Sequence, residues 1–147
     1  MSSNSEFWII RPYQTSDRDE VVALWDSVFR NPADHNQPQR IIDTKLKVQR
    51  ELFFVAALKT DTNKIVGTAL AGYDGHRGWL YQVAVNPEYR KRGLGRALIQ
   101  HAQATLMKLG CEKVNLQVRS ENHEVVAFYE KLGFTSEPRV SLGKRLS

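Results

Sequence analysis

The sequence has a single cysteine, and this scarcity excludes several classes of protein at once. With Cys111 alone, no disulfide can form within the chain, and no Cys/His spacing typical of a zinc site is present. No apolar run approaches the roughly 20 residues that a membrane-spanning helix needs. The first residues, MSSNSEFWIIRP, lack the basic and long apolar segments of a secretory signal. We therefore expect a cytoplasmic protein without a metal site or a membrane partner.

Acidic residues are missing from one long stretch of the chain. None occurs from Tyr89 to Cys111, although the 147 residues include 16 acidic and 21 basic ones and carry a net charge of only +5. The positive charge is therefore concentrated in one region. Such a patch suits a compact polyanion at least as well as a long one.

Length and composition fit one globular domain, which we expect over residues 7–147 after a short N-terminal extension at residues 1–6. The periodicity of the apolar residues predicts the element order β-α-α-β-β-β-α-β-α-β-β. The strands are expected at 7–11, 52–58, 65–73, 79–85, 114–118, from 134 onward and at 140–144. The helices are expected from 17 to 28, around 42–46, at 93–109 and from 122 to 132. This order predicts a mixed sheet with helices on both faces.

The most informative segment is YQVAVNPEYRKRGLGRALI, residues 81–99. An apolar strand and an Asn86-Pro87 turn lead into a basic loop and then a helix. Gly93 and Gly95 allow the main chain to approach a ligand closely, and the helix start offers unpaired N–H groups. Formal positive charge surrounds that helix start at Arg90, Lys91, Arg92 and Arg96. This arrangement predicts a site for a diphosphate or several clustered phosphates.

Two common phosphate-binding motifs do not fit this loop. A Walker A loop needs GxxxxGK[ST], which is absent, and a dinucleotide fingerprint needs a third small residue that the chain lacks. What remains is R-x-x-G-x-G after a strand, formed by Arg90, Gly93 and Gly95. The plain alternative is a basic helix start that contains a convenient glycine.

The segment RKRGLG resembles motif A of the GNAT superfamily, the acetyl-CoA-dependent N-acetyltransferases. A second segment, from Asn122 to Tyr129 and on through EKLGF, is similar to another signature of that family. The likeness extends over the chain from about Phe7, and GYDGHRG (72–78) and SLGKRL (141–146) look closest to a bacterial YpeA-type branch. The resemblance implies an α/β (α+β) fold, with a mixed, mostly antiparallel twisted sheet of 6–7 strands and about four helices on both faces.

The resemblance also implies roles for individual residues. The strand before the loop would carry a bulge and splay from its neighbour, so that pantetheine lies against main-chain groups near Val83, Ala84 and Val85. The diphosphate of acetyl-CoA would lie on the loop amides of Lys91, Arg92, Gly93, Leu94, Gly95 and Arg96. The cations Arg90, Lys91, Arg92 and Arg96 would screen its charge and that of the 3′-phosphate.

Tyr129 matches the family tyrosine that protonates the departing thiolate, and a phenol is protonated at neutral pH as an acid should be. The alternative is a core tyrosine on an apolar helix face. Asn122 would cap its helix, contact the cofactor, or do both.

A general base is not evident in the sequence. Many family members have a glutamate on the strand before the loop, but residues 79–83 contain no acid. Tyr81 and Gln82 are able at best to order a chain of water molecules. Other candidates are Asp74 and His76 in the preceding hairpin and, more weakly, Glu51 and His35.

The sequence thus predicts an N-acetyltransferase that transfers acetyl from acetyl-CoA directly to a small-molecule or peptide amine. The missing glutamate keeps open a non-catalytic acyl-CoA-binding regulatory module. A nucleic-acid-binding domain is a further alternative, but few aromatic residues lie near the loop to stack on bases, so no nucleic-acid partner is expected. Family precedent allows a homodimer through the last strands.

Overall fold

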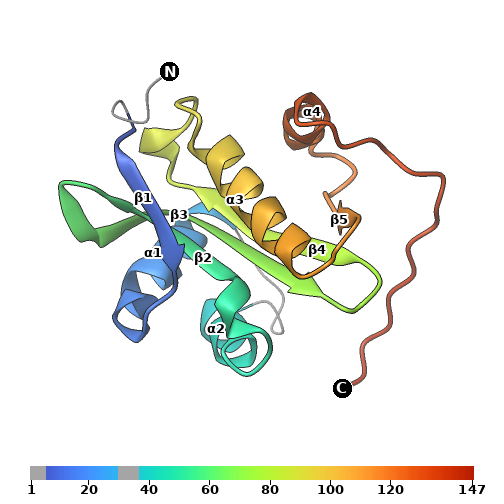
Figure 1. Cartoon of the computed structure of the whole chain (residues 1–147), viewed down its shortest axis with the longest axis horizontal. Coiled ribbons are helices and arrows are strands. Elements are labelled where there is room, and N and C mark those ends of the chain that lie inside the picture. The colour runs from blue at the N-terminus through green and yellow to red at the C-terminus, as the bar shows by residue number, and fades with distance from the viewer. Residues whose placement is uncertain (1–5, 30–36) are drawn as a thin grey trace. The chain divides into compact units, whose positions relative to one another are not determined.

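The computed structural model describes residues 6–29 and 37–147, and the chain forms two compact units that meet in sequence between Leu116 and Gln117 (Figure 1). Of the N-terminal extension expected at residues 1–6, only Glu6 lies within the described residues. The single domain expected over residues 7–147 stays a prediction, and each unit is described by itself.

The first unit is a five-stranded sheet with three helices. Its strands are β1 (Trp8–Pro12), β2 (Phe53–Leu58), β3 (Asp61–Tyr73), β4 (Gly78–Val85) and β5 (Val114–Leu116), and they lie in the order β1-β2-β3-β4-β5. Neighbouring strands are antiparallel except for β4 and β5, which are parallel. The helices are α1 (Arg18–Val28), α2 (Pro38–Lys45) and α3 (Leu94–Lys108), with short 3-10 turns at Thr15–Asp17, Arg50–Leu52 and Pro87–Tyr89.

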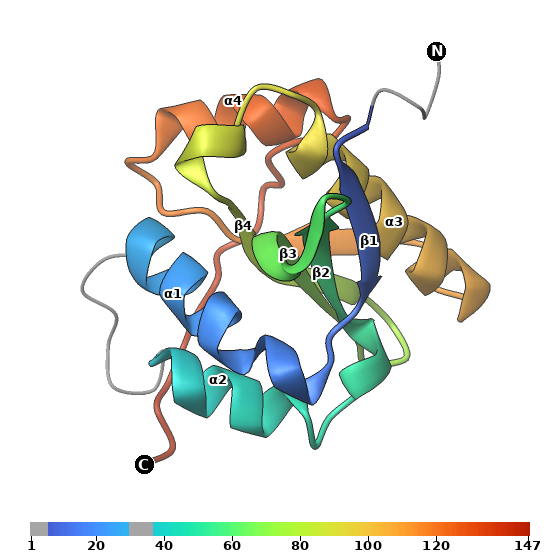
Figure 2. The ribbon, with the colours of Figure 1, turned by 90° about the vertical axis from the view of Figure 1, so that its left-hand side faces the viewer.

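The two faces of the sheet are covered by different helices, because side chains along a strand alternate between faces. On β2, Phe53, Val55 and Ala57 belong to a core with residues of α1 and α2, whereas Ala56 belongs to a core with Leu94 and Leu98 of α3. Figure 2 shows α1 and α2 on one side of the strands and α3 on the other. The predicted fold class, a mixed and mostly antiparallel sheet with helices on both faces, is confirmed.

The second unit contains α4 (His123–Lys131) and, after it, a segment without regular structure. The two strands predicted from 134 onward and at 140–144 are therefore wrong, and the sheet has five strands instead of the expected 6–7. Pro138 lacks an N–H for a ladder, and Val140 and Leu142 are 87% and 90% exposed. An alternating apolar pattern forms a strand only where a neighbouring strand pairs with its backbone N–H and C=O groups.

Other boundaries differ by small amounts. The β2–β3 hairpin turns at residues 59–60, so β3 already begins at Asp61, whereas the strand was expected from residue 65. Leu109, the last residue of the helix expected at 93–109, is the C-cap of α3 and is 48% exposed. Within the described residues, no helix is both long enough and apolar enough to cross a bilayer.

Candidate functional site

Strand β4 carries a bulge at the residues expected to hold pantetheine. Thr68 of β3 pairs with Ala84, but Leu70 pairs with Tyr81, so β4 contains one extra residue between the two pairs. Gln82 lies in this bulge with φ of 48°, a left-handed conformation that is uncommon for residues with a Cβ. Such a bulge interrupts the ladder and turns main-chain groups away from the neighbouring strand.

On its other side, β4 has a strand partner only at its first residues among the described part of the chain. The parallel strand β5 pairs only with Gly78, Trp79 and Leu80, and it ends at Leu116. From Tyr81 to Val85, β4 therefore has no strand partner on this side among the described residues. The bulge and the shortness of β5 together leave Val83, Ala84 and Val85 without a strand partner on this side among the described residues, and their role in holding pantetheine stays a prediction.

The loop after β4 has a backbone conformation that suits an anion. Lys91 has φ of 64° and Gly93 has φ of 89°, and Gly93 is the N-cap of α3, which begins at Leu94. Left-handed residues close together at a helix start orient successive N–H groups into one concavity and add the positive end of the helix dipole. Gly95 follows in the first turn of α3.

The four basic side chains of the loop are not equivalent. Arg90 Nε donates to the carbonyl of Val85 at 3.1 Å, which ties the loop to the end of β4. The Arg92 guanidinium lies over the rings of Phe7 and Tyr89, at 5.4 and 5.7 Å from their centroids. Lys91 and Arg96 are exposed. All four basic residues are thus exposed, and two of the predicted phosphate ligands, Arg90 and Arg92, also make contacts that hold the loop.

Tyr129 and Asn122 lie in the second unit. Asn122 is the N-cap of α4, and its Oδ1 accepts from the Val125 N–H at 3.4 Å, so the predicted capping role is present. Tyr129 is buried between the rings of Phe128 and Phe134. Burial raises the pKa of Tyr129 to about 12. The phenol is protonated at neutral pH, as both an acid and a core tyrosine would be, and its place in the site stays a prediction.

The candidate bases of the hairpin have structural partners. Asp74 Oδ1 accepts from the N–H groups of His76 and Arg77 at 2.7 and 2.6 Å, and these bonds hold the pKa of Asp74 below its usual value. The ring of His76 is exposed beside Arg77, at 2.8 Å from its guanidinium. Both residues serve the turn between β3 and β4. His35 lies outside the described residues.

Sequence reasoning missed one charged residue of this region, Lys45. It is only 3% exposed at the end of α2, its Nζ donates to the carbonyl of Ala71, and it lies over the Tyr81 ring at 5.6 Å from the centroid. Burial lowers the pKa of Lys45 to about 8, although nearby Glu51 opposes this shift. Its burial could have been predicted from its position three residues after Ile42, which places both side chains on the same, inner face of α2.

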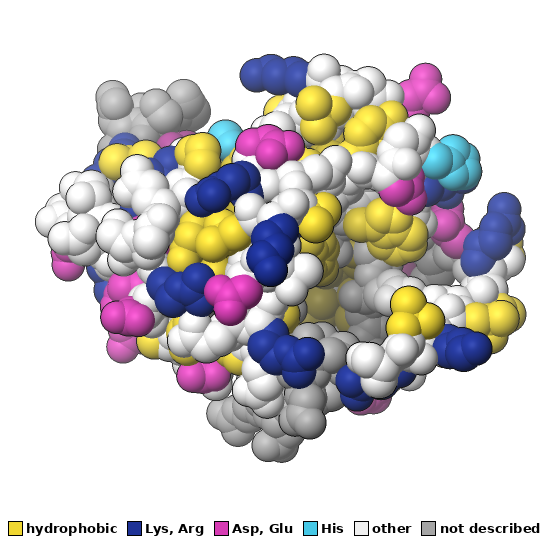
Figure 3. Space-filling model, turned by 90° about the horizontal axis from the view of Figure 1, so that it is seen from below, with side chains coloured by type: hydrophobic (Ala, Val, Ile, Leu, Met, Phe, Trp, Pro, Cys, Tyr) yellow, Lys and Arg dark blue, Asp and Glu magenta, His cyan; other side chains and the backbone are white. Residues whose placement is uncertain are grey.

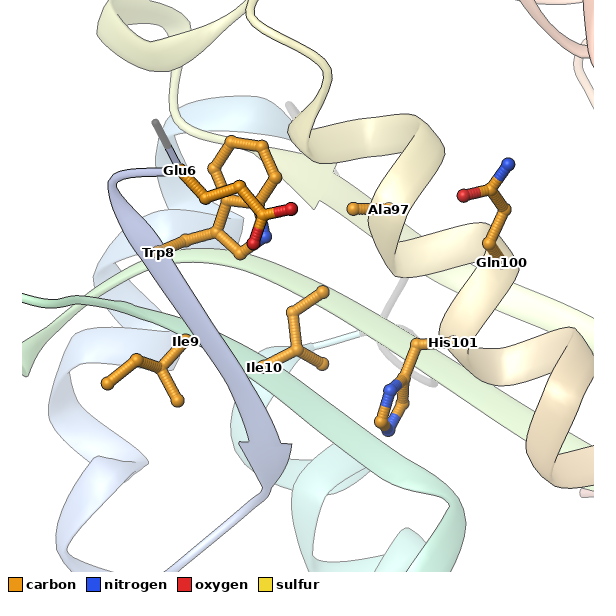
Figure 4. Close-up of a pocket in the computed structure, with 7 residues that line it drawn as sticks. All are labelled: Glu6, Trp8, Ile9, Ile10, Ala97, Gln100 and His101. Atoms are coloured by element: carbon orange, nitrogen blue, oxygen red, sulfur yellow. The ribbon is translucent and has the colours of Figure 1, made fainter. Parts of the chain in front are cut away.

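A groove lies elsewhere, between the edge strand β1 and α3 (Figure 4). It has a volume of about 480 Å³ and is lined by Glu6, Trp8, Ile9, Ile10, Ala97, Gln100 and His101. None of the predicted site residues lines it. Within residues 6–29 and 37–147, no three His, Cys, Asp or Glu side chains come together as a metal site requires.

Comparisons with known proteins find similar sequences and similar structures over most of the chain. The sequence model of the acetyltransferase (GNAT) family matches residues 18–134. An acetyltransferase of Yersinia enterocolitica is 41% identical over 138 residues, which are 93% of this chain and 94% of that protein.

Two solved structures are also similar. The ribosomal-protein-S18-alanine N-acetyltransferase of Escherichia coli has a TM-score of 0.70 and 26% identity over 88% of this chain and 79% of its own. A chain of the NatC complex bound to Gag peptide and CoA has a TM-score of 0.75 over 91% of this chain and 88% of its own, and at 20% identity it supports the fold alone.

Proposed function

The chain belongs to the GNAT family of acetyltransferases, and from this premise we propose that it transfers acetyl directly from acetyl-CoA to an amine. One observation carries the proposal. Strand β4, which has a bulge and pairs with β5 only at its first residues, leads directly into a basic loop with left-handed residues at the start of α3. One segment therefore offers main-chain groups for a thioester and an anion site for a diphosphate.

The backbone conformation and the positive charge of the loop support acetyl-CoA as the cosubstrate. The left-handed conformations of Lys91 and Gly93 collect N–H groups where a diphosphate would lie. The exposed cations Lys91 and Arg96 have side chains able to reach the diphosphate or the 3′-phosphate. Arg90 and Arg92 would add charge from fixed positions, because Val85 and the Phe7–Tyr89 ring pair hold them.

Direct transfer of the acetyl group requires few catalytic groups from the protein. A neutral amine attacks the thioester carbonyl carbon, the carbonyl electrons move onto oxygen, and the carbon–sulfur bond then breaks. In this proposal, main-chain N–H groups of β4 stabilise the oxyanion, and Tyr129 gives its proton to the thiolate. The proton of the amine leaves through water, which Tyr81 and Gln82 would order.

The acceptor we propose is a peptide or small-molecule amine. The Escherichia coli relative is named for an alanine of a ribosomal protein. On the face drawn in Figure 3, Lys and Arg side chains are interspersed with Asp and Glu, an arrangement unlike the basic stripe of a nucleic-acid-binding surface. A cytoplasmic location is part of the proposal, since the buried thiol of Cys111 suits a reducing compartment.

A non-catalytic acyl-CoA-binding module is the second candidate, because β4 contains no carboxylate from Gly78 to Val85. Release of free thiol from acetyl-CoA in the presence of an amine panel separates the two functions. An enzyme gives acceptor-dependent release, whereas a binding module gives affinity without turnover.

Calorimetric titration tests the cofactor assignment. We expect acetyl-CoA to bind in the micromolar range and pantetheine, which lacks the diphosphate, to bind much more weakly. Gly95→Val should abolish binding while circular dichroism shows a folded protein, because a branched side chain would crowd the first turn of α3 at the diphosphate. Equal affinity for pantetheine and acetyl-CoA would refute the loop assignment.

A further inference from the structure

A buried chain of hydrogen bonds connects α1, β3 and the bulge of β4. Trp25 Nε1 donates to Thr68 Oγ1 at 2.8 Å, and Thr68 Oγ1 donates to the carbonyl of Gln82 at 2.8 Å. Trp25 and Thr68 are both fully buried. An indole N–H can only donate and a carbonyl can only accept, so the hydroxyl between them has a fixed direction.

This chain of bonds determines which way the next peptide N–H points. The described residues contain no cis peptide, and in a planar trans peptide the carbonyl of Gln82 and the N–H of Val83 point in opposite directions. The Gln82 carbonyl points to Thr68 on β3. The Val83 N–H therefore points away from β3, to the side of β4 where β5 has already ended.

The bulge needs such a restraint. A left-handed φ of 48° is unfavourable for glutamine, and conformations of this kind persist only where the surroundings fix them. The residue itself supplies no preference for it, as a glycine would. The bond from Thr68 opposes relaxation of the bulge, and Trp25 keeps the Thr68 hydroxyl turned toward Gln82.

We propose that Trp25 and Thr68 are positioning residues for acetyl transfer, which hold the Val83 N–H toward the carbonyl oxygen of the acetyl thioester. The inference rests on the proposed function. As the amine forms its bond to the carbonyl carbon, the electron pair of the C=O bond moves onto oxygen, and the Val83 N–H donates to that oxygen. The electron pair on oxygen then re-forms the C=O bond as the carbon–sulfur bond breaks with its own pair on sulfur, one proton goes to the thiolate and the amine nitrogen loses one. A donor oriented before the substrate arrives needs no reorganisation during the reaction.

The test is the infrared carbonyl frequency of bound acetyl-CoA labelled with ¹³C in the acetyl carbonyl, because a hydrogen bond to the oxygen lowers this frequency. It requires no acceptor. Thr68→Val keeps the shape of the side chain and removes the hydroxyl, Thr68→Ser keeps the hydroxyl, and Trp25→Phe keeps a buried ring without the N–H. Thr105→Val is the matched control, because it removes a hydroxyl that donates to the His101 carbonyl at 3.0 Å within α3.

We expect the wild type, Thr68→Ser and Thr105→Val to lower the carbonyl frequency on binding. In Thr68→Val the frequency should lie close to that of free acetyl-CoA, with Trp25→Phe intermediate. Once an acceptor is known, kcat of Thr68→Val should fall by roughly 10- to 100-fold, as for a displaced oxyanion donor, with a smaller change in KM.

Three results would overturn the inference: equal frequencies in wild type and Thr68→Val, equal loss in Thr68→Val and Thr68→Ser, or the same shift in Thr105→Val. Failure of the proposed function is distinguishable, because the wild type would then either not bind acetyl-CoA or bind it without acceptor-dependent release of thiol.

Discussion

Replacing Gly93 by alanine tests whether the backbone of the loop, and not only its charge, binds the cofactor. An added Cβ would meet only Trp8 Cη2, at 3.9 Å, which is an ordinary contact. The cost is therefore conformational, since φ of 89° is unfavourable by about 1–2 kcal/mol for a residue with a Cβ. At about 2–4 °C per kcal/mol for a chain of this length, the melting temperature should fall by roughly 2–8 °C if the loop keeps its shape.

Any relaxation of the loop turns its N–H groups away from the diphosphate. Hydrogen bonds to charged groups contribute about 1.5–3 kcal/mol each, so the loss of one should weaken acetyl-CoA binding by about tenfold or more. Calorimetric titration measures the affinity and differential scanning calorimetry the stability. Both measurements are made on the same preparation.

Gly110→Ala is the matched control for this experiment. Gly110 follows the other end of α3 with φ of 91°, and nothing lies within 4 Å of its added Cβ. It should lose similar stability and keep the wild-type Kd for acetyl-CoA. If both variants lose the same stability and both bind as the wild type does, the loop conformation is not coupled to the cofactor and the reasoning is refuted.

Three further variants probe the rest of the chain. Tyr129→Phe should lower kcat by about 10²–10⁴-fold with little change in acetyl-CoA affinity, whereas unchanged kcat with a lower melting temperature would make it a core residue only. Lys45 has a folded-state pKa of about 8, below its unfolded value, so the free energy of unfolding should rise with pH between about 8 and 10. Lys45→Met should remove this rise in urea titrations, and a persistent rise would contradict the assignment. Gly78→Ala would place a Cβ 2.8 Å from Cys111 Sγ and 3.1 Å from Leu106 Cδ1. This crowding should lower the free energy of unfolding by about 1–3 kcal/mol. A melting curve like that of the wild type would show instead that the neighbouring side chains move to make room.

Elements could be predicted from the sequence where their apolar spacing and end residues agree with the way they pack in the fold. The helix predicted at 93–109 is α3, Leu94–Lys108, because apolar residues at helical spacing meet a covered sheet face and a glycine stands at each end. The loop was also predictable, since its glycines and cations are adjacent in the chain. The bulge in β4 was not, because it is occupied by a glutamine, and only the family resemblance implied it.

Features that depend on contacts between residues far apart in the chain could not be predicted from the sequence. Val140 and Leu142 alternate like strand residues, but alternation does not reveal whether a neighbouring strand exists. Lys45 resembles a solvated charge until the carbonyl of Ala71 and the ring of Tyr81 are known. Thr68 resembles any β-branched strand residue, and its bonds to Trp25 and Gln82 join segments far apart in the chain.

The stacking of Arg92 on Phe7 and Tyr89 has a thermodynamic consequence for ligand capture. The two rings lie 5.4 Å apart by their centroids and restrict a side chain that would otherwise move freely, so the loop is ordered when the chain folds. A preformed site loses little conformational entropy on association. We therefore expect binding to be a single fast step, whose rate falls steeply with ionic strength because long-range attraction, not loop closure, governs the encounter.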